Sequence, residues 1–184
     1  MVYFTSDLHL GHKAIPKYRE PFGDMKEHDD FIINKILELN KRDILFVLGD
    51  FLFDGDHYDE YIQRLKEAKC RIKVVMGNHD SMKLYNTEEH PFEIQLPLFS
   101  YKGFWLSHAP IHPQEMRNRT GNLHGHLHKE SVKKEISVID KDFCSGTIEV
   151  KDDKYFNVNL DVNDYKFVNL EDIKKVFEEN NERI

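Results

Sequence analysis

Short clusters of metal-binding residue types are spread along the chain. They are Asp7-Leu8-His9, Gly49-Asp50, Gly77-Asn78-His79-Asp80, Ser107-His108 and Gly125-His126-Leu127-His128. Together they supply enough carboxylate, amide and imidazole groups to bind two divalent cations side by side. A pair of metal ions in one site activates water and holds a phosphate during in-line displacement. These residue types therefore favour phosphoester hydrolysis.

Each of these residues also has a simpler interpretation. An aspartate that follows a strand is commonly a helix N-cap or a turn residue, which would be our interpretation of Asp7, Asp50 or Asp80 alone. Here the three aspartates coincide with Asn78 and several histidines, and burying so many ionisable groups without a metal would be costly. For His124, two roles are open: packing in the core, or donating a hydrogen bond that supports the site. We expect the remaining histidines to be half exposed or bonded to a backbone carbonyl; these are His28, His57 and His90.

The motifs stand where an α/β protein places its active site. The first four each follow an apolar run typical of a buried strand, namely Val2–Thr5, Ile44–Leu48, Ile72–Met76 and Phe104–Leu106. Amphipathic helical patterns lie between them, at residues 31–39 and 58–68. Because open α/β sheets bind ligands at the carboxyl ends of their strands, we expect the motifs to meet at one sheet edge.

The spacing inside the motifs indicates which side chains cooperate. In an extended segment, residues two apart point the same way. Asp7 and His9 could therefore bind one ion together, and His126 and His128 could reach a common site. Asp50 is the lone carboxylate beside a strand-end glycine, and we expect it to bridge two cations. Glycines mark the sharp exits from strands, where close backbone approach requires no side chain; these are Gly11, Gly49, Gly77 and Gly125.

Taken in order, the motifs resemble those of the calcineurin-like metallophosphoesterase family. The resemblance runs from about Val2 to His128, and residues 157–170 are similar to the closing strands and helix of compact members. It implies a compact, uncapped phosphoesterase of the bacterial or phage type. The expected fold is a single-domain α/β/β/α sandwich of two mixed β-sheets flanked by helices, with the metal site at the C-terminal edge of the strands.

The resemblance also implies a ligand set for each of two divalent ions, with a hydroxide bridging them. The first ion would be bound by Asp7, His9, Asp50 and His128. The second would be bound by Asp50, Asn78, His108 and His126. His79 would face the phosphate or the leaving oxygen as a general acid, and Asp80 would orient His79 through a hydrogen bond.

The ligand types narrow the choice of metal. Carboxylate, amide oxygen and imidazole without thiolate suit Mn²⁺, Fe, Zn²⁺ or Ni²⁺. Among these we expect Mn²⁺. The number of histidines disfavours Mg²⁺, which prefers oxygen ligands and keeps its waters.

Substrate contacts are expected from loops around the cleft. His12 and His112 lie on such loops, and Arg117 or Arg119 could bind phosphate oxygens in a bidentate fashion, although an exposed loop arginine is an equal alternative. The prolines in the segment 109–115 favour a rigid loop rather than a helix.

The expected activity is that of a phosphodiesterase acting on small phosphodiesters or nucleotides by direct attack of the bridging hydroxide. A phosphomonoesterase of the same fold is an alternative. So is a single-strand nuclease, in which Tyr18, Phe22 and Phe53 would stack on bases. A non-catalytic binding module that kept the fold is less favoured, because every expected ligand position and His79 are filled.

The bulk composition excludes several other classes of protein. With 184 residues and 40% hydrophobic content, we expect one domain over residues 1–184. A net charge of −7 argues against strong binding of duplex nucleic acid. The longest apolar stretch, residues 44–53, is too short to span a membrane, and from the few residues before Asp7 we expect no secretion signal. Cys70 and Cys144 fit a reducing cytoplasm, and a homo-oligomer is compatible with the sequence.

The remaining segments carry their own patterns. Residues 129–154 alternate apolar and polar side chains, which predicts an inserted β-hairpin. Residues 11–27 are long for a connection between a strand and a helix, and we expect them to influence specificity. A strand is predicted at 156–160 and a short amphipathic helix from Leu170 to Phe177.

Overall fold

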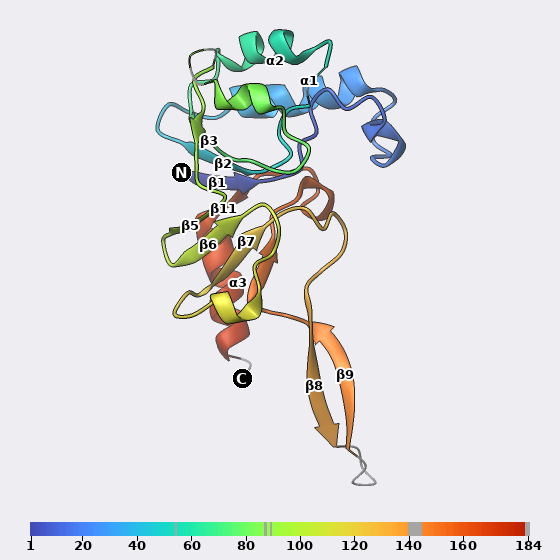
Figure 1. Ribbon diagram of the computed structural model, residues 1–184, viewed down its shortest axis with the longest axis vertical. Coiled ribbons are helices and arrows are strands. Elements are labelled where there is room, and N and C mark those ends of the chain that lie inside the picture. Colours follow the sequence, from blue (N-terminus) through green and yellow to red (C-terminus); the bar gives the residue numbers. More distant parts are fainter. Residues whose placement is uncertain (54, 87, 89, 140–144, 183–184) are drawn as a thin grey trace.

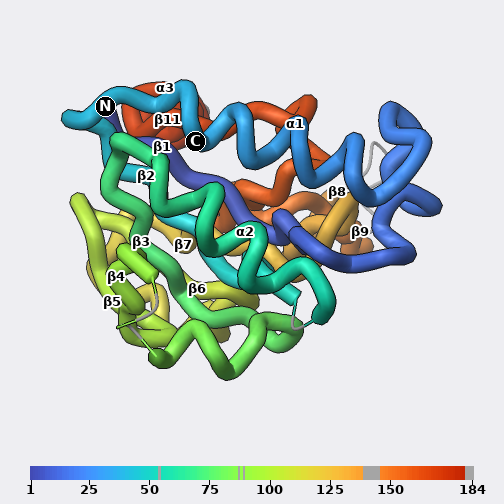
Figure 2. The backbone as a smooth tube through the Cα atoms, turned by 90° about the horizontal axis from the view of Figure 1, so that it is seen from above, coloured from blue at the N-terminus to red at the C-terminus, as the bar shows by residue number. Residues whose placement is uncertain are grey.

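The protein is described here by a computed structural model covering residues 1–53, 55–86, 88, 90–139 and 145–182. Two β-sheets pack against one another, and helices α1 (Met25–Leu37) and α2 (Tyr58–Leu65) cover the outer face of the first sheet (Figures 1 and 2). Helix α1 begins where the side chain of Asp24 accepts a hydrogen bond from the backbone N–H of Glu27.

The first sheet has the strand order β11-β1-β2-β3-β4. The strands are β1 (Val2–Thr5), β2 (Ile44–Leu48), β3 (Arg71–Val75), β4 (Glu93–Ile94) and β11 (Val168–Asn169). All neighbours are parallel except β11, which pairs antiparallel with β1. Because central parallel strands are buried on both faces, they read as continuous apolar runs. The sequence predicts β1 and β2 with these bounds and β3 one residue later than it lies, and it does not predict the short edge strands β4 and β11.

The second sheet has the order β10-β7-β6-β5. The strands are β5 (Leu98–Tyr101), β6 (Phe104–Ser107), β7 (Gly121–His124) and β10 (Tyr155–Asn157). Only β5 is antiparallel to its neighbour, so both sheets are mixed, and the predicted α/β class with two mixed sheets is confirmed. The strand predicted at residues 156–160 corresponds to β10, which is shorter and ends at Asn157. The chain turns into a 3₁₀ helix, η4 (Leu160–Val162), where Asn159 accepts a hydrogen bond from the backbone of Asp161.

Two apolar clusters hold these layers together. One lies between the first sheet and helices α1 and α2, and it contains Ile33, Val47 and Leu65. The other lies between the sheets, around Phe46 and Leu106, and continues onto helix α3 (Leu170–Glu182). Each fully buried side chain of this size contributes about 1.5–3 kcal/mol. The ends of the strands are therefore fixed relative to one another across both sheets.

A separate hairpin projects from the body of the molecule (Figure 1). Its strands, β8 (Lys133–Ile139) and β9 (Ser145–Lys151), pair antiparallel, with Ile136 opposite Ile148. It lies in the stretch for which the sequence predicts a hairpin. Cys144 lies outside the described residues, whereas Cys70 is buried. Among the described residues, no helix has the length and apolar character needed to cross a bilayer.

Candidate metal centre

The strand-end motifs of both sheets meet at one edge. Hydrogen bonds join them through the backbone: the N–H of Asp7 donates to the carbonyl of Gly49 (2.9 Å), and that of His9 to the carbonyl of Asp50 (2.8 Å). The backbone N–H of His126 donates to the carboxylate of Asp7 (3.0 Å). Residues from the start, middle and end of the motif region are thereby brought together.

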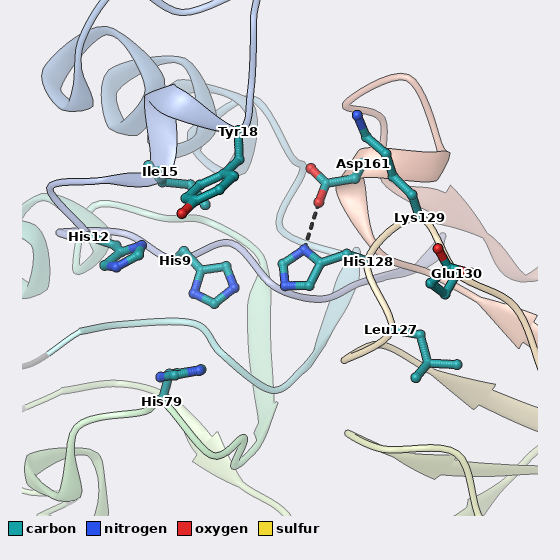
Figure 3. A pocket seen from close by; sticks show the side chains of 10 residues that line it. All are labelled: His9, His12, Ile15, Tyr18, His79, Leu127, His128, Lys129, Glu130 and Asp161. Atoms are coloured by element: carbon teal, nitrogen blue, oxygen red, sulfur yellow. Dashed lines mark hydrogen bonds and ion pairs between the residues drawn. The ribbon is translucent and has the colours of Figure 1, made fainter.

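The first cluster of ligand atoms is formed by Asp7, His9 and His128. One ligand atom from each lies within 4.8 Å of the others. The imidazoles of His9 and His128 stack with centroids 5.4 Å apart (Figure 3). The Nε2 atom of His9 is also 3.8 Å from Oδ2 of Asp50. These residues could hold one divalent ion.

A second cluster, formed by Asp7, Asp50 and His108, adjoins the first and has Asp7 in common with it. Nε2 of His108 is 3.5 Å from Oδ1 of Asp50 and 2.9 Å from Oδ1 of Asn78. Nδ1 of His126 is 3.1 Å from the same Asn78 oxygen and 3.2 Å from Nε2 of His108. The two oxygens of Asp50 therefore face different clusters.

The protonation of these groups fits a cation. Nδ1 of His108 is 2.9 Å from the carbonyl of Leu48, so in the neutral ring Nδ1 donates to that carbonyl and Nε2 is the nitrogen able to bind a cation. Nε2 lies 2.9 Å from the amide oxygen of Asn78, and both atoms could bind the same ion. Among the described residues, neither ring nitrogen of His9 has a hydrogen-bond partner although both are buried.

The electrostatics of the buried groups agree with this. Burial lowers the pKa of His9 to about 2, and the charge of Arg19 acts in the same direction. His9 is therefore neutral, as an imidazole ligand must be. Burial raises the pKa of Asp7, because its carboxylate is fully enclosed. A bound cation would compensate for that charge.

The backbone at these residues is left-handed, whereas the prediction from residue spacing assumed an extended backbone. Positive φ angles occur at Asp7 (56°), His9 (51°), Asp50 (53°), His126 (68°) and His128 (49°). Such left-handed residues concentrate at functional sites, where the fold enforces them. Asp7 and His9 do share a cluster. His126 and His128 instead reach different clusters, because both have a left-handed backbone and the two-residue periodicity of an extended segment is lost.

Comparison with known proteins gives the family. The sequence model for calcineurin-like phosphoesterases matches residues 1–180. The chain belongs to this family. Membership supports a phosphoester hydrolase that uses divalent metals, for which the two clusters provide candidate ligands.

Several relatives of this phosphoesterase are known. A solved structure of a protein of unknown function from Aquifex aeolicus is similar with a TM-score of 0.67 and 27% identity, covering 96% of this chain and 98% of that chain. An uncharacterized protein of Methanocaldococcus jannaschii is 26% identical over 181 residues, 96% of this chain and 91% of the relative. A probable cyclic nucleotide phosphodiesterase of Coxiella burnetii is 29% identical over 84 residues, 45% of this chain and 32% of the relative.

Three strand-end glycines of the phosphoesterase have the close neighbours that the sequence predicts, and among these neighbours are candidate ligands. The atoms nearest to an added Cβ are His108 Nδ1 for Gly49, Asp50 Oδ1 for Gly77 and Ser6 Oγ for Gly125, each at 2.2 Å. At Gly125 an added Cβ would also lie 2.3 Å from Oδ2 of Asp7. Gly11 differs, because its nearest neighbours lie at 3.7 Å and its requirement for glycine comes from its φ of +85°.

Replacing Gly125 by alanine is expected to destabilise the protein and displace Asp7. Overpacking of this kind costs about 1–3 kcal/mol. We expect a lower free energy of unfolding in urea and weaker Mn²⁺ binding by calorimetry. Gly146→Ala is the matched control, because an added Cβ there meets nothing within 4 Å. Equal stability of the two variants would contradict the role given to Gly125.

Asp80 has a different role from the one we expected. Its carboxylate accepts hydrogen bonds from four backbone N–H groups, which belong to Asp50 (2.9 Å), Phe51 (2.6 Å), Leu52 (2.9 Å) and Gly77 (2.7 Å). No bond from it to His79 occurs among the described residues. Four donors saturate both oxygens, so Asp80 fixes the turns that follow β2 and β3 instead of orienting His79.

A pocket of about 470 Å³ opens over the first cluster (Figure 3). His12 and His79 line it, and both imidazoles stack on Phe53, with centroids 4.5 and 5.5 Å from the phenyl ring. Ile15 and Tyr18 add an apolar wall. Of the four expected substrate contacts, His12 therefore lies in this pocket.

The other three expected substrate contacts have local partners and do not line this pocket. Arg117 pairs with Glu115 at 3.2 Å, and the guanidinium of Arg119 lies 5.2 Å from the ring of Trp105. The imidazole of His112 accepts a hydrogen bond from the backbone of Gln114. This bond caps a short 3₁₀ helix, η3 (Pro113–Glu115), where we expected only a rigid loop.

Sequence reasoning missed a buried polar group behind the site. His28, expected to be half exposed or bonded to a carbonyl, is fully buried between Arg19 (2.7 Å) and Asp29 (2.6 Å). Arg19 also binds Asp161, which is 142 residues away in the chain. No local sequence signal reveals such a pair. The expected bond to a backbone carbonyl is present at His90, which bonds the carbonyl of Leu84.

Proposed function

We propose that this phosphoesterase is a binuclear metal-dependent phosphodiesterase that hydrolyses small phosphodiesters or nucleotides by direct attack of water. The observation that carries the proposal is the pair of adjoining clusters, which have Asp7 in common and between which Asp50 places one oxygen near His9 and the other near His108. The first ion would be held by Asp7, His9, Asp50 and His128. The second would be held by Asp50, Asn78, His108 and His126. Mn²⁺ is the proposed metal, and Fe, Zn²⁺ or Ni²⁺ also suit the ligands.

The two ions, when bound, lower the pKa of water and compensate for the charge of the phosphoryl group. The protein's own groups supply the rest. Asp50 offers one oxygen to each cluster, with Oδ2 toward His9 and Oδ1 toward His108. His79 lies in the pocket with an exposed imidazole, from which it donates a proton to the leaving oxygen. His12 binds a phosphate oxygen from the same side.

The pocket wall supports a diester over a monoester. Ile15, Tyr18 and Leu127 line it, and such side chains pack against an ester substituent better than against the hydrated oxygens of a dianion. The similarity to a probable cyclic nucleotide phosphodiesterase points the same way.

The experiment is metal removal followed by a comparison of two substrates. Treatment with a chelator is expected to abolish hydrolysis, and addition of Mn²⁺ to restore it, because the candidate ligands have no other means of activating water. The reloaded enzyme should then turn over bis(p-nitrophenyl) phosphate faster than p-nitrophenyl phosphate. Faster turnover of the monoester would overturn the diester preference, and full activity after chelation would overturn the metal mechanism.

The nuclease alternative is weaker than the sequence suggests. Phe22 is 8% exposed and packs among His28, Phe31 and Tyr165, so it cannot stack on a base. Phe53 is already in contact with two imidazoles. Of the three expected stacking residues, only Tyr18 presents its ring, with 70% of the residue exposed. Hydrolysis of small substrates is therefore the better proposal.

A further inference from the structure

A buried ion pair lies directly behind the first cluster. The side chain of Arg19 is 0% exposed, and its Nε donates to Oδ1 of Asp161 at 2.7 Å. The other oxygen of Asp161 is 2.7 Å from Nδ1 of His128, the contact drawn as a dashed line in Figure 3. One carboxylate therefore joins the guanidinium to a candidate ligand.

The same guanidinium binds the backbone of the first motif. Its Nη2 donates to the carbonyl of Asp7 at 2.6 Å, and its Nη1 to the carbonyl of Leu8 at 3.3 Å. Asp7 has a left-handed backbone, which needs such support. Arg19 thus touches the turn that aims Asp7 and, through Asp161, the imidazole of His128, from opposite ends of the motif region.

The network behind the ion pair is satisfied and identifies which groups are charged. Nη1 of Arg19 lies 2.7 Å from Nε2 of His28, so this nitrogen accepts and His28 is neutral. Its Nδ1 donates to Asp29 (2.6 Å), which also accepts from Tyr61 (2.7 Å) and from the backbone of Gly11 (2.9 Å). Fully satisfied buried networks are rigid. The guanidinium therefore has a fixed position from which to act.

We propose that Arg19 and Asp161 are positioning residues that hold the proton of His128 on Nδ1 and turn its Nε2 lone pair toward the first ion. The inference rests on the proposed function, because His128 has to be a metal ligand. A carboxylate behind a metal-binding imidazole fixes both tautomer and ring orientation. A buried ion pair adds little stability over well-packed apolar side chains. Orientation of the site therefore explains this pair better than stability does.

The first test is the tautomer of His128 in the full-length, metal-free protein. Nitrogen chemical shifts of ¹⁵N-histidine-labelled protein, recorded at alkaline pH where the ring is neutral, report which nitrogen carries the proton, and His128→Gln identifies the signal. We expect the Nδ1–H form in the wild type and a shift toward Nε2–H in Asp161→Asn. Asp30→Asn is the matched control, because Asp30 on helix α1 also accepts a hydrogen bond from an arginine, Arg64 on helix α2, at 2.6 Å. It should leave the His128 signal unchanged.

The second test is Mn²⁺ titration by calorimetry. Asp161→Asn should weaken binding of one ion by about 10- to 100-fold and leave the other unchanged. Arg19→Lys should do the same in a folded protein, since a lysine cannot reproduce the fork of hydrogen bonds. A wild type that binds no Mn²⁺ would overturn the proposed function together with this inference. A wild type that binds two ions, with Asp161→Asn unchanged in tautomer and affinity, would overturn this inference alone.

Discussion

Replacement of Asp50 by asparagine is expected to remove the first ion and retain the second. Oδ1 of Asp50 accepts a hydrogen bond from the backbone N–H of His79 at 2.9 Å, which an asparagine oxygen can keep. The amide nitrogen then replaces Oδ2, which faces His9, and an N–H donor cannot bind a cation. Loss of about 4 kcal/mol of charge stabilisation corresponds to about 1,000-fold lower turnover. Elemental analysis and diester hydrolysis measure the two effects.

A control aspartate lies six residues further along the chain. Asp56 is also paired, with Lys13 at 3.1 Å, but its side chain is 80% exposed and touches neither cluster. Asp56→Asn should therefore bind two ions and hydrolyse diesters at the wild-type rate. If Asp50→Asn behaved in the same way, the position of Asp50 between the clusters would have no functional meaning.

The central strands β1, β2 and β3 of the first sheet could be predicted from sequence because parallel strands buried on both faces leave continuous apolar runs. Val2–Thr5 and Ile44–Leu48 have the predicted bounds for this reason. The edge strands β4 and β11 have two residues each and leave no such run. The prediction of the strand near Phe156 is less accurate. The strand ends before residue 160 because a side-chain cap at Asn159 starts a 3₁₀ turn. Local capping competes with apolar periodicity, and the periodicity alone does not record it.

The candidate ligands also could be named from sequence, because their motifs, taken in order, resemble those of the family and the first four follow apolar runs typical of strands. Their conformation could not. Nothing in the spacing of Asp7 and His9 indicates positive φ angles, which depend on how the turns are held by distant groups. Arg19 illustrates the point: its contact with Asp161 forms only when the distant segment around Asn159 pairs with Ser6, next to β1. Asp80 is a second case, because its four N–H donors come from turns after two different strands.

The second large effect is expected from His79→Asn. His79 belongs to neither cluster of ligand atoms, and its backbone contact with Asp50 does not depend on its side chain, so both ions should stay bound. Loss of a general acid should lower hydrolysis of an alkyl phosphodiester by about 100- to 10,000-fold. The loss should be smaller for bis(p-nitrophenyl) phosphate, because p-nitrophenolate leaves without needing a proton.

This dependence on the leaving group distinguishes proton donation from a general disturbance of the site. Damage to metal binding or to the stack on Phe53 would lower the hydrolysis of both substrates alike. His57→Asn is the control, because the side chain of this histidine is half exposed and lies 3.1 Å from Glu60 at the start of α2, in neither cluster. It should leave both rates unchanged. An equal loss on both substrates, or full turnover of the alkyl diester with two ions bound, would mean that the leaving oxygen receives its proton from a group other than His79.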